Sequence, residues 1–258
     1  MSRRALDVVL FDVGGTILRV SPSVGEVYAR AARDHGFEID SEAVNQGFRI
    51  AWRRSFERSQ ARGYRTSDAI LRAEWFEIVR DTFGESIPAA SIRPLFEDIY
   101  DRFVSPGPWE LVVGVRETLE YLRGEGVRLG VLSNWDSRLE PMLEELRLRS
   151  AFDFVVVSHS IEYEKPHPEI FAHAIRRSGA APDRTLHVGD SYLADINPAR
   201  CAGFQTLWVA SKEERLKEGY VGFGFESFPA KPLPFWRQIL YEGLQTLLPP
   251  RAAQDSTG

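Results

Sequence analysis

Short apolar runs alternate with amphipathic stretches along much of the chain. Five such runs, rich in β-branched and aromatic side chains, predict buried strands at 6–11, 127–132, 154–157, 185–188 and 206–209. A helical pattern precedes or follows each run, and buried strands that alternate with helices are typical of a parallel sheet covered on both faces. The pattern therefore predicts an α/β fold whose core is a doubly wound parallel sheet.

A long helical segment interrupts this alternation between residues 21 and 105. Apolar side chains recur there in four sets at the three- and four-residue spacing of helices, and no part of the segment resembles a strand. A Ser-Pro pair at 21–22 and a Pro-Gly-Pro run at 106–108 flank it, and such residues suit hinges. We therefore expect an all-helical cap domain, 21–105, inserted into a core domain formed by 1–20 and 106–248. Beyond it we expect a disordered tail, 249–258.

Composition changes this picture mainly by excluding classes of function. The share of apolar residues is 43% and that of charged residues 27%, an ordinary globular balance. Because the net charge is −5, we expect neither nucleic acid nor a membrane surface as a partner. No run approaches the roughly 20 apolar residues of a membrane helix, and 8–11 is too short for the core of a signal peptide. The oligomeric state stays open.

Cysteine usage points to a compartment. The single cysteine, Cys201, excludes an intrachain disulfide and fits a reducing environment, so we expect a cytoplasmic protein. Cys201 lies among small residues in a helical pattern, and we expect it to be buried as a small apolar group.

Polar side chains follow four of the predicted strands. In chain order they are Asp12 with the turn Gly14, Gly15 and Thr16, then Ser133 and Asn134, then Lys165, then Asp190 and Asp195. Each has an ordinary structural account by itself, as a turn, an exposed loop or a helix N-cap. Ligands of open parallel sheets bind beyond the carboxyl ends of the strands, so four such ends in order predict one shared site.

These residue types suit a phosphoryl group beside a metal. A carboxylate next to a glycine turn can act as a nucleophile or bind a metal, and Asp12 is placed for either role. The hydroxyl of Ser133 and the amide of Asn134 can bind phosphate oxygens, and Lys165 can supply a positive charge to a phosphoryl group and to a carboxylate nucleophile. Together with Asp12, the carboxylate pair after the fourth strand makes an all-oxygen site suited to Mg²⁺.

At these residues the chain resembles the haloacid dehalogenase-like (HAD-like) hydrolase superfamily, whose core is Rossmann-like. The resemblance covers about residues 5–18 and 108–210, and the helical segment takes the place of the family's first-position (C1) cap. Two short strings, Ser-Val-Gly-Glu-Val-Tyr and Ser-Asn-Trp-Asp-Ser-Arg-Leu, resemble one group within that family. The resemblance implies a Mg²⁺-dependent hydrolase that acts on a small phosphorylated metabolite through an aspartyl-phosphate.

The resemblance also implies a role for each matching residue. Asp12 matches the nucleophile, Ser133 the phosphate-binding hydroxyl, Lys165 the basic residue, Asp190 the metal-binding acid and Asp195 its acidic partner. The implied catalytic residues are thus Asp12, Ser133 and Lys165. The implied phosphate contacts add Gly15, Thr16 and Asn134, and the implied metal ligands are Asp12, Gly14 through its carbonyl, Asp190 and Asp195.

The chain departs from the family pattern at Gly14. Phosphatases of the family usually carry a second Asp here, which protonates the leaving group and then activates water. Gly14 has no side chain and can do neither, although its carbonyl could still coordinate a metal. General acid–base help is worth roughly 10²–10⁴-fold in rate. We therefore predict a phosphatase that is slow or limited to good leaving groups.

Several alternatives follow from this departure. The protein could be a catalytically weak regulatory module that keeps the metal and phosphate site, with Gly14 as its main support. It could be a 2-haloacid dehalogenase, although those relatives need no metal and lack the Gly-Asp pair found at 189–190. The family's Schiff-base mechanism is excluded, because the segment 21–105 contains no Lys. Asp136, His159 and His167 are the candidate substitutes for the missing acid.

Overall fold

The computed structural model describes residues 6–210 and 224–225. A central sheet of six parallel strands forms the core of these residues, in the order β5-β4-β1-β6-β7-β8. The strands are β1 (Val8–Phe11), β4 (Arg128–Ser133), β5 (Phe154–Val157), β6 (Thr185–Gly189), β7 (Gln205–Val209) and β8 (Gly224–Phe225). The predicted α/β fold is therefore confirmed, and all five predicted strands are present. The sixth, β8, was not predicted because the apolar pattern fades after β7.

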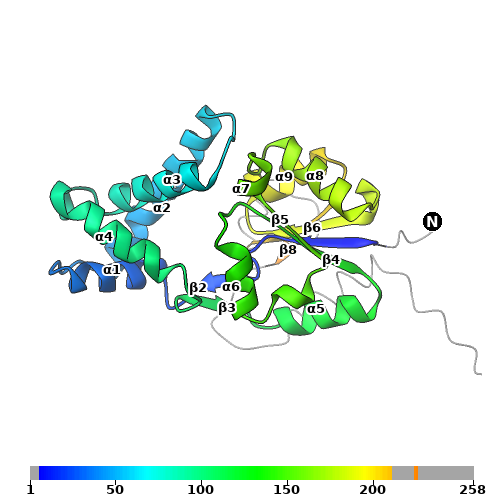
Figure 1. Cartoon of the computed structure of the whole chain (residues 1–258), viewed down its shortest axis with the longest axis horizontal. Helices are drawn as coiled ribbons and strands as arrows, with labels where there is room; N and C mark the ends of the chain where they lie inside the picture. The colour runs from blue at the N-terminus through cyan, green and yellow to red at the C-terminus, as the bar shows by residue number, and fades with distance from the viewer. Residues whose placement is uncertain (1–5, 211–223, 226–258) are drawn as a thin grey trace, which may run out of the picture.

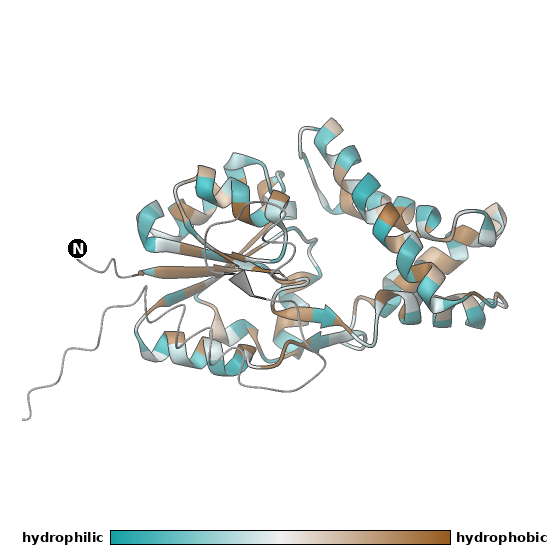
Figure 2. Cartoon of the chain, turned by 180° about the vertical axis from the view of Figure 1, so that it is seen from behind, coloured by the Kyte–Doolittle hydropathy of each residue, from teal (hydrophilic) through white to brown (hydrophobic). Residues whose placement is uncertain are grey.

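Helices cover both faces of this sheet (Figure 1). Helices α5 (Val115–Gly124) and α6 (Leu139–Glu145) lie on one face, and α7 (Ser158–Ile161), α8 (Pro168–Ser178) and α9 (Asn197–Cys201) lie on the other. Successive side chains of a strand point to opposite faces, and β1 shows this directly. Val9 and Phe11 pack in the cluster with α5 and α6, whereas Val8 and Leu10 pack in the cluster with α8. Figure 2 shows the strands as the apolar centre between helices with polar outer faces.

Four helices fill the segment in which four helical sets were predicted. They are α1 (Val24–Asp34), α2 (Ser41–Ala61), α3 (Asp68–Phe83) and α4 (Ala89–Arg102), with a short 3₁₀ turn after α3. Ser23, Asp40 and Ser67 cap the first three helices, since each side chain accepts a hydrogen bond from a backbone N–H of the first turn. The helices share a core of their own, in which Tyr28 and Phe96 are among the largest buried side chains. The assignment of 21–105 as a separate domain stays a prediction.

A small antiparallel pair of strands joins the cap helices to the core. Strand β2 (Leu18–Val20) pairs with β3 (Trp109–Leu111). Arg19 and Glu110 lie opposite each other in this pair and form an ion pair of 3.0 Å. The sequence analysis predicted hinges at this place but missed the strands, because each is only three residues long.

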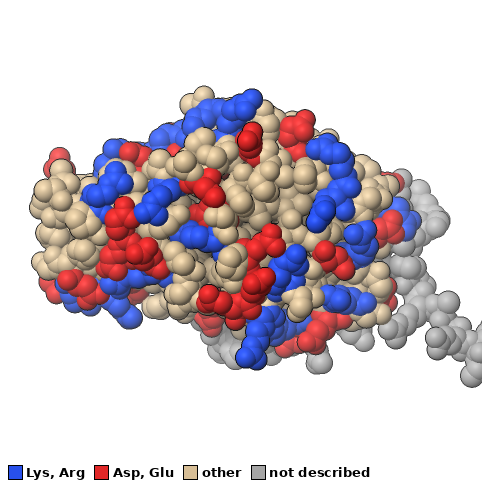
Figure 3. All heavy atoms as spheres, viewed as in Figure 1, with Lys and Arg blue, Asp and Glu red and all other residues tan. Residues whose placement is uncertain are grey.

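The remaining expectations concern Cys201, membrane helices and the end of the chain. Cys201 ends α9 and is exposed, so the prediction that it is buried was wrong. No helix among the described residues has both the length and the apolar character needed to cross a membrane. Basic and acidic side chains are interleaved over the face shown in Figure 3. The end of the predicted core up to 248 and the predicted tail at 249–258 lie outside the described residues.

The first prediction concerns a half-buried ion-pair cluster that ties α4 to the end of α1. Asp98 accepts hydrogen bonds of 2.9 Å from Nε and Nη2 of Arg102 and lies 3.2 Å from Nε2 of His35. The Arg102 hydrogen bonds hold the pKa of Asp98 below its ordinary value. The stabilisation is therefore complete above a pH of about 4 and is lost as pH falls through the lowered pKa. We expect Asp98→Asn to lower the free energy of unfolding by about 1 kcal/mol at pH 7.

Urea unfolding at pH 7 and at pH 3 measures this effect. Asp101→Asn is the matched control, because Asp101 lies on the same helix and is exposed. An equal loss from Asp98→Asn at both pH values would contradict the ion-pair account.

Candidate active site

The carboxyl ends of three neighbouring strands meet at one edge of the sheet. Phe11 of β1 is paired with Val131 of β4 on one side and with Val188 of β6 on the other. Asp12 follows Phe11 directly, and its backbone N–H donates a 2.9 Å hydrogen bond to the carbonyl of Val188. Ser133 ends β4 and therefore reaches the same edge. The register of the strands thus brings the predicted site residues to one place.

Lys165 links two carboxylates at this edge. Its Nζ donates a 2.8 Å hydrogen bond to Oδ1 of Asp12 and also pairs with Oδ1 of Asp195. The hydroxyl of Ser133 donates a 2.9 Å hydrogen bond to the same Oδ1 of Asp12. All four side chains are buried. Among the described residues no hydrogen bond reaches Oδ2 of Asp12, so this oxygen is left for a ligand.

Asn134 holds the main chain of Lys165. Its Oδ1 accepts a 2.7 Å hydrogen bond from the N–H of Lys165, and its Nδ2 donates one of 2.8 Å to the carbonyl of Lys165. The phosphate contact predicted for this amide stays a prediction. In the structure both of its polar atoms bind the main chain of the loop that carries Lys165.

Asp195 is held from three directions. Besides Lys165, its Oδ1 lies 3.0 Å from Nε2 of His187, and its Oδ2 accepts a 3.0 Å hydrogen bond from the N–H of Ser191. It belongs to the π-helical turn η4 (Tyr192–Ile196). Gly189 makes room for it, because a Cβ at that position would lie 2.4 Å from the Cγ of Asp195.

Asp190 lies on the open side of the same edge. The turn at Gly15 is close beneath it: Gly15 has a φ of +80°, and a Cβ there would lie 2.3 Å from Oδ2 of Asp190. Thr16 is buried, and its hydroxyl lies 3.5 Å from Oδ1 of Asp190, at the outer limit of a hydrogen bond. Gly15 and Thr16 therefore support the acidic group by shape more than by hydrogen bonding.

The surroundings shift the pKa values of these groups in opposite directions. Burial raises the pKa of Asp12, although Lys165 offsets part of this rise. Desolvation, followed by repulsion from Asp12 and Asp195, raises the pKa of Asp190 well above its usual range. Burial alone would raise the pKa of Asp195, but Lys165 and His187 hold it below the ordinary value. Burial opposes the charge of Lys165, but the two carboxylates raise its pKa above the usual range.

The acidic group fits a divalent cation. One carboxylate oxygen from each of Asp12, Asp190 and Asp195 lies within 4.8 Å of the other two. Three carboxyl groups stand here with the one ammonium group of Lys165, so a doubly charged cation would offset the remaining negative charge. Hard oxygen donors of this kind are the ligands that Mg²⁺ prefers.

The helical segment reaches this site through the loop between α2 and α3. The segment between α2 and α3 pairs with the core segment before Lys165, since Thr66 N–H donates to the Glu162 carbonyl and Glu164 N–H donates to the Tyr64 carbonyl, each at 3.0 Å. The hydroxyl of Ser59 in α2 also donates to the carboxylate of Glu164. The two parts enclose a cavity of about 510 Å³ that reaches from Asp12 to the aromatic side chains of α2 and α3.

The three candidate substitutes for the missing acid are engaged elsewhere. Asp136 is buried and ion-paired with Arg138 at 2.6 Å, and it accepts a 3.3 Å hydrogen bond from the hydroxyl of Tyr100. His159 lies 3.5 Å from Asp68 of the cap. His167 caps α8 through its ring nitrogen.

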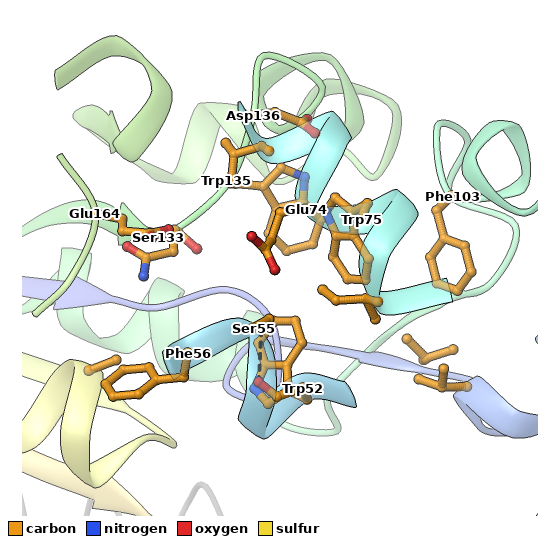
Figure 4. Close-up of a pocket in the computed structure, with 18 of the residues that line it drawn as sticks. Trp52, Ser55, Phe56, Glu74, Trp75, Phe103, Ser133, Trp135, Asp136 and Glu164 are labelled. Carbon is orange, nitrogen blue, oxygen red and sulfur yellow. Dashed lines mark hydrogen bonds between the residues drawn. The ribbon is translucent and has the colours of Figure 1, made fainter. Parts of the chain in front are cut away.

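Sequence reasoning missed two carboxylates of the cavity, Glu164 and Glu74. Glu164 is 8% exposed, and burial raises its pKa. Glu74 of α3 projects towards the middle of the cavity, between Trp75 and Trp135 (Figure 4). The position of Glu164 directly before Lys165 was the only sequence signal for either residue.

One aromatic ring, that of Trp135, lies beside position 14. A Cβ on Gly14 would lie 3.4 Å from Cζ3 of Trp135, which is ordinary van der Waals contact. A side chain at position 14 would therefore stand against this ring, and apart from its neighbours in the chain no other described residue lies within 4 Å of its Cβ.

These features define a class of protein, in which a carboxylate site lies at the edge of a parallel sheet beneath a helical cap. Residues 6–203 match the family "haloacid dehalogenase-like hydrolase", and the chain belongs to that family.

The similar proteins agree with this assignment. The haloacid dehalogenase-like hydrolase domain-containing protein 3 of Homo sapiens is 36% identical over 82% of this chain and 84% of its own length. It bears the name of the group that the two short strings resemble, so that narrower resemblance is confirmed.

Two solved structures share the fold. The HAD phosphatase from Thermococcus onnurineus is 23% identical, with a TM-score of 0.55, and the match covers 94% of this chain and 98% of that one. A dehalogenase solved with an intermediate complex is 18% identical, with a TM-score of 0.65 over 81% of this chain and 87% of that one.

The second prediction tests the contact between Gly15 and Asp190. Gly15→Ala and the control Gly36→Ala both place a Cβ at positive φ, +80° and +86°, but the space around Gly36 is open. We expect both variants to lose about 1 kcal/mol of unfolding free energy through backbone strain. If the acidic group binds Mg²⁺, the cation should raise the melting temperature of the wild type. Only Gly15→Ala also displaces Asp190, so we expect only this variant to lose that rise.

Thermal unfolding with and without Mg²⁺ measures both effects. An undiminished Mg²⁺ response in Gly15→Ala would show that Asp190 does not bind the cation.

Proposed function

We propose that this protein is a Mg²⁺-dependent phosphohydrolase that works through a phosphoryl group carried on Asp12. The observation that carries the proposal is the pairing of Lys165 with Asp12, at 2.8 Å in a buried site whose acidic group suits a divalent cation. Membership of a hydrolase family supports the reaction type. We further propose that it acts on small phosphorylated molecules, and in the cytoplasm, whose reducing conditions suit a chain with one cysteine.

The contacts assign a part to each residue. Hydrogen bonds from Lys165 and Ser133 to Oδ1 orient Asp12 and favour its carboxylate form, so Oδ2 can attack phosphorus. A phosphorus–oxygen bond to Asp12 forms as the bond to the leaving group breaks, and water then cleaves the aspartyl-phosphate. Lys165 and Ser133 bind the other oxygen of the same carboxylate, Oδ1, so they also stand close to the place of the negative phosphoryl oxygens. Asn134 and Asp195 position Lys165.

The acidic group supplies the metal site of this proposal. Asp12, Asp190 and the carbonyl of Gly14 would hold Mg²⁺, with Asp195 behind them. Bound there, the cation would neutralise charge on the phosphoryl oxygens.

Gly14 limits which leaving groups the reaction can tolerate. Without an acid at position 14, the leaving oxygen departs as an anion, and Asp136, His159 and His167 are bound to other partners. Acyl and aryl phosphates tolerate this, whereas sugar phosphates need a proton. We therefore propose a preference for good leaving groups.

The third prediction tests this function with acetyl phosphate, p-nitrophenyl phosphate and a sugar monophosphate, each with Mg²⁺. We expect the wild type to hydrolyse the first two and to act on the sugar phosphate about 10²–10⁴-fold more slowly. Asp12→Asn should lower kcat by at least about 10³-fold, because it removes the nucleophile. Gly14→Asp should accelerate hydrolysis of the sugar phosphate, and the control Gly14→Ala, which adds only the Cβ, should not.

Other outcomes identify the other candidates. A wild type inactive on all three esters, with a Gly14→Asp variant that is active, indicates a regulatory module. Because a dehalogenase shares this fold, halide release from a 2-haloacid is measured in parallel. Release that continues in the presence of a chelator would point to dehalogenation instead.

A further inference from the structure

A continuous row of aromatic rings lines the cavity from the cap to the nucleophile. The ring centroids of successive members lie between 5.0 and 6.0 Å apart. In order of contact, the members of this aromatic row are Trp75, Trp52, Phe48, Tyr28, Phe103, Trp109 and Trp135. All seven line the same cavity. The row is therefore one surface built by α1, α2, α3, β3 and the segments after α4 and β4.

One end of the aromatic row lies at the reacting centre. The ring of Trp135 lies 3.4 Å from the place that a Cβ at position 14 would take. Trp135 also follows Asn134, whose amide holds Lys165. Near the other end, Trp52 keeps 52% of its surface exposed although it lines the cavity. Figure 4 shows Trp52, Trp75 and Trp135 on different sides of one space. An occupant of this space would touch rings on several sides and bury the free face of Trp52.

The basic side chains of the cavity are already paired. Arg62 bonds Glu74 at 2.7 Å, and Arg138 and Arg19 are ion-paired with Asp136 and Glu110. Lys165 is held by the two carboxylates of the phosphoryl site.

A leaving group with its own carboxylate or second phosphate would therefore find no unpaired cation among the described residues that line the cavity. It would also face the carboxylates of Glu74 and Glu164. Burying an unpaired charge is costly, so the cavity disfavours an anionic leaving group.

We propose that the leaving group is a flat, uncharged aromatic alcohol, so that the substrate class is the aryl phosphate monoesters. This inference rests on the proposed function. The bond from Asp12 to phosphorus forms while the phosphorus–oxygen bond to the ring breaks, and the phenolate leaves with the electron pair and takes a proton from solvent. Water then cleaves the aspartyl-phosphate, which returns the carboxylate and releases inorganic phosphate. A phenolate needs no acid at position 14, so the aromatic row and Gly14 favour the same substrate.

Three esters with Mg²⁺ test this proposal: phenyl phosphate, 2-naphthyl phosphate and phosphoglycolate. The two aryl esters release phenols of similar acidity, so a difference between them reports contact with the second ring. We expect KM for 2-naphthyl phosphate to be about 10-fold lower than for phenyl phosphate, since stacking a ring on an aromatic side chain is worth about 1–3 kcal/mol. Phosphoglycolate should be the poorest substrate.

Variants of α2 locate the effect. Trp52→Ala should remove most of the preference for the naphthyl ester, and Trp52→Phe should restore part of it. Ile50→Ala is the matched control, because Ile50 is a 54% exposed apolar residue of the same helix outside the cavity. Equal KM values for the two aryl esters, or a preference for phosphoglycolate, would overturn the proposal while leaving hydrolysis of acetyl phosphate intact.

Binding separates this proposal from the proposed function. If no ester and no acetyl phosphate is hydrolysed, the proposed function fails, and titration calorimetry with Mg²⁺ still compares the two aryl esters as ligands. Tighter binding of 2-naphthyl phosphate that Trp52→Ala abolishes supports the aromatic site. Equal binding of both esters rejects it.

Discussion

The ammonium group of Lys165, held between the buried carboxylates of Asp12 and Asp195, is the interaction on which the site depends. Burying an ammonium group is costly, and two carboxylates offset that cost only if they are held in place. Ser133 fixes the first carboxylate, and His187 and the N–H of Ser191 fix the second. Without the ammonium group, the carboxylates of Asp12 after β1 and of Asp195 in η4 would repel each other. The charge of one side chain thus joins elements from four parts of the chain.

The cavity has two halves with different physical character. Its floor is polar and charged and comes from strand ends, where backbone register sets positions. Its walls are aromatic and come mainly from the cap, where they double as the packing of α1, α2 and α3. Glu164 connects the two halves. It directly precedes Lys165, and its carboxylate accepts a hydrogen bond from the hydroxyl of Ser59 in α2. This hydrogen bond therefore ties the helical segment above the site to the loop that carries the lysine, and covering such a site excludes water from the reaction.

Much of the core could be predicted from the sequence, because buried parallel strands are continuous apolar runs and their carboxyl ends carry polar residues in order. The same logic placed Asp12, Ser133, Lys165, Asp190 and Asp195 together. Three-residue strands such as β2 and β3 carry too little pattern to be found. The use of Asn134 as a clamp, the pairing of Asp136 with Arg138 and the place of Glu74 depend on contacts between distant segments. The aromatic row could not be predicted for the same reason, because most of its rings occupy positions that the sequence pattern assigns to the packed faces of helices.

The central claim is that Asp12 carries the phosphoryl group, and its direct test is to trap that group. The wild type is mixed briefly with acetyl phosphate and Mg²⁺, quenched in acid and analysed by peptide mass spectrometry. Because Gly14 leaves no side chain to activate water, the account predicts that the phosphorylated form accumulates and that the phosphate maps to Asp12. Steady hydrolysis of acetyl phosphate without phosphate on Asp12 would contradict the account.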